Sequence, residues 1–385
     1  MPQRTYMVID ARRDHSVRVP RPDLSVKLGT PNACTECHKD KSEQWAADAA
    51  NRWYGHAPSG LQRYAETVQM GVDGAPGAEQ RLEALVEDTS QPAIARATAL
   101  SLLAQLAPAP EGASNSLGAT DASPLVRRAA AHRLSGGDIG DQTRVAKSLV
   151  TDPIRAVRIE TAEVLATLSA NDLAFEDLST DIEHATDEYV TAEELDADRP
   201  EAHMNLALLF ARQQKYQRAE AELKIALSLD PDFAPASVNL ADLYRGLGRD
   251  AEGEAVLSSA LKRSPDNGSL LHALGLLMVR RKQISKALAL LGEAACLVPA
   301  NARYAYVYAV ALNDNGRTAA AINVLEESIK VHPFDRDSLS ALVIFLEREG
   351  HSTNALTYAQ RLNGLKPGKP DVRHTFPALN TRPGS

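Results

Sequence analysis

The chain has 385 residues, of which 44% are apolar and 24% are charged, a composition ordinary for a folded polypeptide of two or three domains. No run of about 18 apolar residues occurs, so no segment is predicted to span a membrane. The formal net charge is −8, although residues 1–63 carry 10 Lys/Arg against 7 Asp/Glu, and an acidic body argues against nucleic acid as the main partner. Abundant Ala and Leu favour an all-α fold.

The first predicted segment, residues 1–70, contains the one chemical motif of the sequence. Residues 34–38 read Cys-Thr-Glu-Cys-His, the signature of c-type haem attachment. Two thiols at this spacing reach the two vinyl groups of haem, and the adjacent histidine then serves as an axial iron ligand. The motif predicts one covalent haem c, with Cys34 and Cys37 as thioether sites and His38 as the axial ligand.

Two other chemistries of the cysteine pair stay open. A zinc site would combine Cys34 and Cys37 with His38, His15 or His56. The neighbouring Cys37 and His38 cannot easily bind one metal, however, and the sequence has no second Cys-x-x-Cys pair. A thioredoxin-like redox pair would need a βαβ context, which the flanking residues do not predict.

The second axial ligand of the predicted haem has several candidates. His15 lies in the polar run Arg12–Ser16 and is the first candidate for a distal ligand, of this haem or of a neighbouring one. His56 and Met7 are weaker candidates. Met7 is more simply interpreted as a packed apolar residue. Four arginines either pair with the haem propionates or form a solvated basic face: Arg12, Arg13, Arg18 and Arg21.

Local structure in this segment is predicted from caps and periodicity. Thr30-Pro31-Asn32 reads as a helix start directly before the motif. Lys39–Tyr54 reads as an amphipathic helix with Trp45, Ala49 and Trp53 on one face, which packs on a macrocycle or forms ordinary core. The stretch Val17–Leu28 contains two prolines and is predicted to be extended.

Residues 78–180 show a 31-residue period. Arg96, Arg127 and Arg158 share one column, and each follows shortly after a proline. The best-preserved units, Asp121–Ala131 and Asp152–Ala162, resemble HEAT-like repeats, in which paired helices stack. The resemblance implies that the aspartates and arginines make contacts between repeats.

The stretch Glu176–Asp198 holds 10 acidic residues and no Lys or Arg. We read it as the solvated acidic face of a helix, with a docking surface for a basic partner as the alternative.

Residues 181–368 show a 34-residue period. Small residues recur in one column and larger apolar residues in another, and a proline closes each repeat; the prolines are Pro231, Pro265, Pro299, Pro333 and Pro367. These columns match the tetratricopeptide pattern of paired helices, without its Trp. Five repeats after a degenerate half-repeat are predicted to stack into a solenoid whose concave face binds a protein partner, with a mere spacer as the alternative. Residues 369–385 are predicted to form an irregular tail.

Four isolated residues of the repeats have side chains of the metal-ligating type. Cys296 is predicted to be packed core, and three histidines are predicted to be groove or surface residues and not metal ligands: His203, His272 and His332.

The N-terminal segment also resembles a known family. The stretches Arg4–Val8, Arg12–Ser16, Val19–Leu24 and Leu28–Cys34 are similar to the last part of multihaem c-type cytochromes of the cytochrome c-554 type that end in HEAT-like and tetratricopeptide repeats. The resemblance implies that Cys34 and Cys37 hold haem, that His38 is the proximal ligand, and that His15 is a distal ligand.

The sequence departs from that family in two respects. It has a single Cys-x-x-Cys-His motif, and Met1–Tyr6 lacks the apolar stretch of an export signal. The simplest interpretation is a C-terminal fragment, or a start placed at an internal methionine. Because haem is attached outside the cytoplasm, we expect a periplasmic or other extracytoplasmic location if the full-length parent is exported.

Two functions are therefore predicted. The first is an electron-transfer c-type cytochrome fragment whose repeats bind a redox protein or a further haem domain. The alternative is a non-redox adaptor that binds partner peptides, with Cys34–His38 as a relic or a metal site. A complete active site of its own is not expected, since the sequence has no Gly-rich phosphate loop, nucleophile elbow or His-Glu-x-x-His; a reductase with an open iron position is a weaker third hypothesis.

Overall fold

The computed structural model describes residues 3–6, 10–13, 20–56, 62–106, 116–135, 139–166 and 178–365. The chain divides into two compact units, Met1–Met70 and Gly71–Ser385. Apart from one short hairpin, the regular structure of the described residues is helical, which confirms the predicted all-α class. Among these residues, no helix has both the length and the apolar character needed to cross a bilayer.

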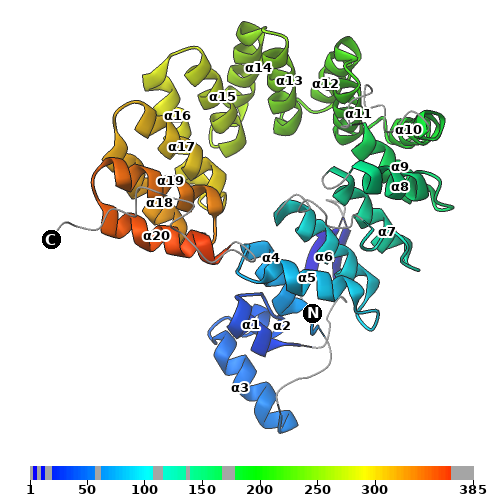
Figure 1. Cartoon of the computed structure of the whole chain (residues 1–385), viewed down its shortest axis with the longest axis vertical. Coiled ribbons are helices and arrows are strands. Elements are labelled where there is room, and N and C mark those ends of the chain that lie inside the picture. The colour runs from blue at the N-terminus through cyan, green and yellow to red at the C-terminus, as the bar shows by residue number, and fades with distance from the viewer. Residues whose placement is uncertain are drawn as a thin grey trace. The chain divides into compact units, whose positions relative to one another are not determined.

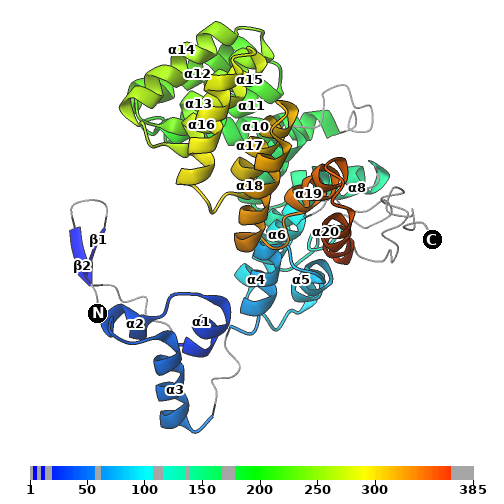
Figure 2. The ribbon, with the colours of Figure 1, turned by 90° about the vertical axis from the view of Figure 1, so that its left-hand side faces the viewer.

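The first unit begins with an antiparallel hairpin that the sequence did not predict. Strand β1 (Gln3–Tyr6) pairs with β2 (Asp10–Arg13), so that Gln3 lies opposite Arg13 and Tyr6 lies opposite Asp10 (Figure 2). Helix α1 (Pro22–Leu28), α2 (Ala33–Cys37) and α3 (Glu43–Tyr54) follow.

The prediction of an extended chain was wrong for residues 22–28. Pro22 occupies the first turn of α1, where its fixed φ suits a helix and its missing N–H is not needed. Asp23 lies in the same turn, and Gly29 ends the helix with a left-handed φ of 70°. The proline therefore starts a helix here and does not prevent one.

The next part of the chain consists of short packed helices. It comprises α4 (Ala65–Asp73), α5 (Ala78–Glu87), α6 (Ala93–Leu106), α7 (Pro124–Ala131), the 3-10 turn η1 (His132–Ser135), α8 (Ile139–Val150) and α9 (Arg155–Leu165). Helix α6 packs on α5 and α7, and α7 packs on α9. The repeated motif thus places the beginnings of α6, α7 and α9 in equivalent positions.

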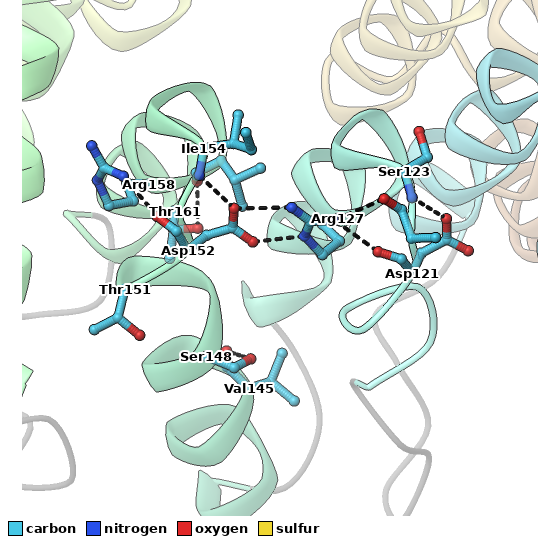
Figure 3. A network of polar contacts seen from close by, with 12 residues as sticks. Asp121, Ser123, Arg127, Val145, Ser148, Thr151, Asp152, Ile154, Arg158 and Thr161 are labelled. Atoms are coloured by element: carbon cyan, nitrogen blue, oxygen red, sulfur yellow. Dashed lines mark hydrogen bonds and ion pairs between the residues drawn. The ribbon is translucent and has the colours of Figure 1, made fainter.

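The 31-residue arginine column forms a ladder of ion pairs between these helices, and Figure 3 shows its middle pair, Arg127 with Asp152. Arg96 binds Asp121, and Arg127 Nε lies 2.6 Å from Asp152 Oδ2. Each aspartate also accepts a hydrogen bond of 2.8 Å from the backbone two residues on, Ser123 N–H or Ile154 N–H. The predicted contacts between repeats are therefore present, and each aspartate both binds the preceding arginine and accepts a hydrogen bond from the N-cap residue of the following helix.

The last arginine of the ladder binds outside the repeat pattern. Arg158 Nε donates to Glu188 Oε2 at 2.8 Å, on α10 (Ser179–Glu194). Helix α10 packs on α9 and also contacts the following helix. Because α10 contacts both neighbours, the boundary drawn between residues 180 and 181 stays a prediction.

Ten further helices form the 34-residue repeats as five antiparallel pairs (Figure 1). The first helices of the pairs are α11 (Pro200–Arg212), α13 (Ala234–Gly246), α15 (Gly268–Arg280), α17 (Ala302–Asp314) and α19 (Arg336–Arg348). The second helices are α12 (Tyr216–Leu229), α14 (Asp250–Arg263), α16 (Ile284–Leu297), α18 (Thr318–Val331) and α20 (Ser352–Gly364).

The predicted columns form the interior of these pairs. The column of small residues is fully buried at Ala219, Ala287, Ala321 and Ala355. At Gly253, a Cβ would lie 3.4 Å from the carbonyl oxygen of Ala241, which shows how closely the paired helices approach. Large side chains at these positions would force the pair apart.

Cys296 does not belong to this interior, so its prediction as packed core was wrong. It is exposed. The buried residues of α16 are Ala287, Leu288, Leu291 and Ala294. Cys296 follows Ala294 by two positions, and residues two apart on a helix do not share a face.

Polar contacts tie successive repeats together. Glu220 on α12 accepts hydrogen bonds from Arg249 Nη1 at 2.7 Å and from Tyr244 OH at 3.0 Å, both of the next repeat. The bonds from Arg249 and Lys224 lower the pKa of Glu220 to about 2, against the raising effect of its burial. Because the folded pKa is depressed, this contact stabilises the array above the usual glutamate pKa and is lost as the pH falls towards 2.

Candidate functional site

The exposed side of the first helices forms a surface that is continuous from α11 through α13 to α15 and again from α17 to α19, because these helices contact one another in sequence. We call this surface the first-helix face and define it by two columns spaced 34 residues apart. One column is Leu208, Asp242, Leu276, Val310 and Ile344, and the other is Met204, Val238, His272, Tyr306 and Ser340.

The first-helix face offers apolar side chains to solvent. None of the ten column residues is buried, whereas Leu206, Leu274 and Leu342 of the same helices are. Ile344 is 40% exposed, and Val279, one turn after Leu276, is 37% exposed. A run of half-exposed apolar groups along several helices is typical of surfaces that bind another chain.

A pocket of about 270 Å³ opens on this face between α11 and α13. It is lined by apolar side chains, one aromatic ring and two polar groups: Ala207, Leu208, Ala211, Tyr216, Leu223, Asn239, Asp242, Leu243, Gly246 and Leu247.

The three histidines of the repeats are partly buried, and each contacts another group of the chain. His272 stacks on Tyr304 with ring centroids 4.4 Å apart. Burial, and then the charge of Arg303, lowers the pKa of His272, so this ring is neutral near pH 7. His203 Nδ1 lies 2.6 Å from Glu222 Oε2, and His332 Nε2 lies 2.9 Å from the Pro299 carbonyl oxygen.

The Cys-x-x-Cys-His motif forms one short helix, α2, and its end. Asn32 caps the helix as the sequence predicts, since its Oδ1 accepts from Cys34 N–H at 3.0 Å and Thr35 N–H at 3.2 Å. Cys34 and Cys37 are separated by one turn and so lie on the same side of α2. His38 N–H donates to the Cys34 carbonyl at 2.9 Å, which fixes the histidine at the helix end.

An apolar cavity of about 430 Å³ adjoins the motif. Cys34, Cys37 and His38 line it from α2, and the predicted face of α3, Trp45, Ala49 and Trp53, lines it from another side. Trp53 and Tyr54 are 74% and 70% exposed, an unusual position for such large apolar surfaces. The aromatic face of α3 is therefore the wall of a cavity and is not closed core.

The residues of this cavity fit a covalent haem. Two thiols one turn apart with a histidine directly after them match the attachment signature of haem c, and the aromatic walls offer an apolar surface of the kind that packs on a macrocycle. His56 also lines the cavity. His15, Met7 and Arg18 lie outside the described residues, and so do the side chains of Arg12 and Arg13.

Arg21, one of the arginines predicted to pair with a haem propionate or to form a basic face, forms an ion pair with Asp23. Its Nε lies 2.9 Å from Asp23 Oδ1, and its Nη2 lies 2.7 Å from Asp23 Oδ2. For the zinc alternative, no group of three or more His, Cys, Asp or Glu side chains gathers within the described ranges.

The paired helices at a 34-residue repeat define a helical-repeat solenoid of the tetratricopeptide type. Residues 210–275 match one tetratricopeptide repeat family, and residues 181–232 and 272–330 match a second family with the same description. Tetratricopeptide repeats therefore occupy residues 181–330, within the range that the 34-residue period predicted.

The chain is similar to several solved structures, one of them described as a tetratricopeptide protein. A crystal structure of MamA is 17% identical, with a TM-score of 0.37 and coverage of 41% of this chain and 93% of that one. YrrB, described as a TPR protein with an unusual peptide-binding site, is 21% identical, with a TM-score of 0.36 and coverage of 48% and 95%. PilF of Pseudomonas aeruginosa is 19% identical, with a TM-score of 0.40 and coverage of 48% and 86%. No curated protein sequence matches the chain significantly.

The sequence reasoning did not single out the residues of the first-helix face. The signal was present, because Leu208, Leu276, Val310 and Ile344 repeat at 34 residues like the core columns. Each residue of the Leu208 column follows a residue of the Leu206 column by two positions, which corresponds to a rotation of about 200° around the helix axis. The Leu208 column therefore points away from the paired helix.

Proposed function

We propose that this protein is an interaction scaffold whose first-helix face binds a segment of a partner polypeptide. The proposal rests on one observation: each of the five first helices carries at least one partly exposed apolar side chain in the columns that define this face. Such a surface loses water-exposed apolar area when a partner covers it, which favours binding. The partner segment must therefore carry apolar side chains of its own.

Charged substitutions on the first-helix face test this proposal. Peptides of 12 residues are first selected from a random display library on the full chain, and their Kd is measured by fluorescence anisotropy. Val279→Asp and Ile344→Asp should each weaken binding at least about tenfold, because a carboxylate buried without a partner is costly. Both side chains are exposed in the free protein, so the variants should fold.

Ile225→Asp is the matched control, since Ile225 is 40% exposed but lies on the second helix α12. It should leave Kd unchanged. Equal losses in all three variants, or no loss in the first two, would count against the first-helix face.

We propose covalent haem attachment and electron transfer as a second role, supported by the apolar cavity that Cys34, Cys37 and His38 line together. Cys34 and Cys37 would hold the haem by thioether bonds, His38 would be its axial ligand, and His15 would be a candidate distal ligand. When bound, the group supplies one-electron Fe(III)/Fe(II) chemistry. Trp45 and Trp53 would shield its apolar faces, the redox partner would be a further haem domain or another redox protein, and the location would be extracytoplasmic.

A pyridine haemochrome spectrum tests this second role. The chain is expressed with an export signal and a c-type maturation system, and we expect one covalent haem per chain. Cys34→Ser with Cys37→Ser should abolish covalent attachment, while Cys296→Ser, which alters an exposed thiol of α16, should leave it intact. Exported, folded protein without haem would overturn the electron-transfer role and leave the scaffold role standing.

A further inference from the structure

The pocket between α11 and α13 lies where the second repeat departs from the others. In the first-helix column, Asp242 stands among Leu208, Leu276, Val310 and Ile344. Four residues later, Gly246 stands where the other repeats have Arg212, Arg280, Asp314 and Arg348. A Cβ built at Gly246 would meet nothing within 4 Å, so the space before it is open. Compared with the other repeats, the second repeat therefore has a carboxylate at position 242 and lacks a side chain at position 246.

The pocket combines an apolar body with a polar edge. Leu208, Leu243, Leu247 and the ring of Tyr216 supply apolar lining, and Asn239 and Asp242 supply the polar groups. A lysine or arginine side chain has the matching form, because its long stem is apolar and its end is cationic.

The carboxylate of Asp242 is open to exchange of its partner. Arg245 Nε donates to Asp242 Oδ1 at 2.8 Å, but the two side chains are 50% and 62% exposed. Solvent screens such a pair, so a second cation can take its place. Arg212, which occupies the position of Gly246 in the preceding repeat, pairs instead with Glu163, with Nη1 3.4 Å from Oε1.

The surrounding helices favour a cationic ligand. Residues 179–246, which span α10 to α13, carry 14 Asp/Glu against six Lys/Arg, an excess equal to the net charge of −8 of the whole chain. A negative field of this kind raises the local concentration of basic segments.

We propose that this pocket takes a lysine or arginine side chain of the bound partner, with the stem against Leu208 and Leu247 and the cation on Asp242. The inference rests on the proposed scaffold function. It specifies that the partner segment is apolar and carries one basic side chain at the position that contacts the second repeat.

The test uses the random 12-residue display library on the full chain. Selected peptides should share a Lys or Arg at one position. For a synthetic selected peptide, Asp242→Asn should weaken binding about tenfold. It should have no effect on the same peptide with norleucine in place of the lysine. Asp314→Asn, which alters an exposed carboxylate of α17, should change neither Kd.

The outcomes separate this inference from the function on which it rests. If Val279→Asp weakens the binding of the selected peptides but these peptides share no Lys or Arg position, the inference is overturned and the scaffold proposal stands. An equal loss for the lysine and norleucine peptides in Asp242→Asn would do the same. If no selected peptide is sensitive to either first-helix substitution, the scaffold proposal fails as well.

Discussion

Replacing Asp152 by alanine should lower the free energy of unfolding of the surrounding helices by about 3–5 kcal/mol, because it leaves the guanidinium of Arg127 without its carboxylate. The side chains of Asp152 and Arg127 are only 4% and 14% exposed. Asp152 accepts two hydrogen bonds from Arg127, at 2.6 and 3.1 Å, and one from Ile154 N–H. The substitution therefore removes the ion pair together with the hydrogen bond that orders the N-cap residue of α9.

The same residue should make this region sensitive to acid. Burial raises the pKa of Asp152, but the hydrogen bonds from Arg127 and Ile154 N–H outweigh it and hold the pKa below the ordinary aspartate value. Because the folded pKa is depressed, the stabilisation is complete above the unfolded pKa and is lost as the pH falls through the folded one. In Asp152→Ala, the free energy of unfolding should therefore fall less steeply than in the unchanged protein as the pH drops below the ordinary aspartate pKa.

Hydrogen–deuterium exchange of the α7 and α9 amides measures this effect locally, which suits a solenoid whose parts open separately. Glu327→Gln is the control, because Glu327 and its partner Lys330 are 72% and 66% exposed; its effect should stay within about 0.5 kcal/mol. Unchanged protection of α7 and α9 in Asp152→Ala would mean that the ladder does not hold these helices together.

Truncating Leu342 to alanine should cost about 2–5 kcal/mol, through lost apolar burial and the cavity that remains. Leu342 is fully buried in a cluster with Leu325, Leu339 and Phe345, in which the last two repeats meet. The loss should appear as faster exchange of the α17–α20 amides, with α11 and α12 unchanged, since each repeat contacts only its neighbours.

Leu356→Ala removes the same atoms from the same repeat, but Leu356 is 41% exposed. Its expected cost is below about 1 kcal/mol. If the two variants lost equal protection, the 34-residue column would not be the core that the fold assigns to it.

The periodic part of the fold followed from the sequence, because each repeat makes the same local contacts. A small residue every 34 positions marks where two helices touch, and Ala219, Ala287 and Ala321 are buried for that reason. The ion-pair ladder could be predicted from the sequence only where the 31-residue repeat continues. Arg158 would find Glu183 at the spacing of the earlier pairs, yet it binds Glu188, because α10 is one continuous helix and presents a different residue to α9.

Single positions were harder to predict than columns. The neighbours Ala294 and Ala295 predict that Cys296 is core, but exposure on a helix depends on the angular position of a residue and not on its apolar neighbours in the chain. Pro22 was read as a helix breaker, although its place in a first turn makes it a helix starter.

The sites differ in what local sequence could reveal. The Cys-x-x-Cys-His motif is visible because its chemistry depends on neighbours in the chain. The pocket of Asp242 and Gly246 depends on α11 and α13 meeting, so only the comparison of one repeat with the next could have pointed to it.

Site-directed photo-crosslinking determines whether the partner binds to the first-helix face. The amino acid p-benzoylphenylalanine is placed at Val279 on α15 or at Ile225 on α12, two positions of similar exposure. With a labelled library-selected peptide present, we predict a crosslinked band from Val279 and none from Ile225. Crosslinking from Ile225 alone, or equally from both positions, would contradict the assignment of binding to the first-helix face.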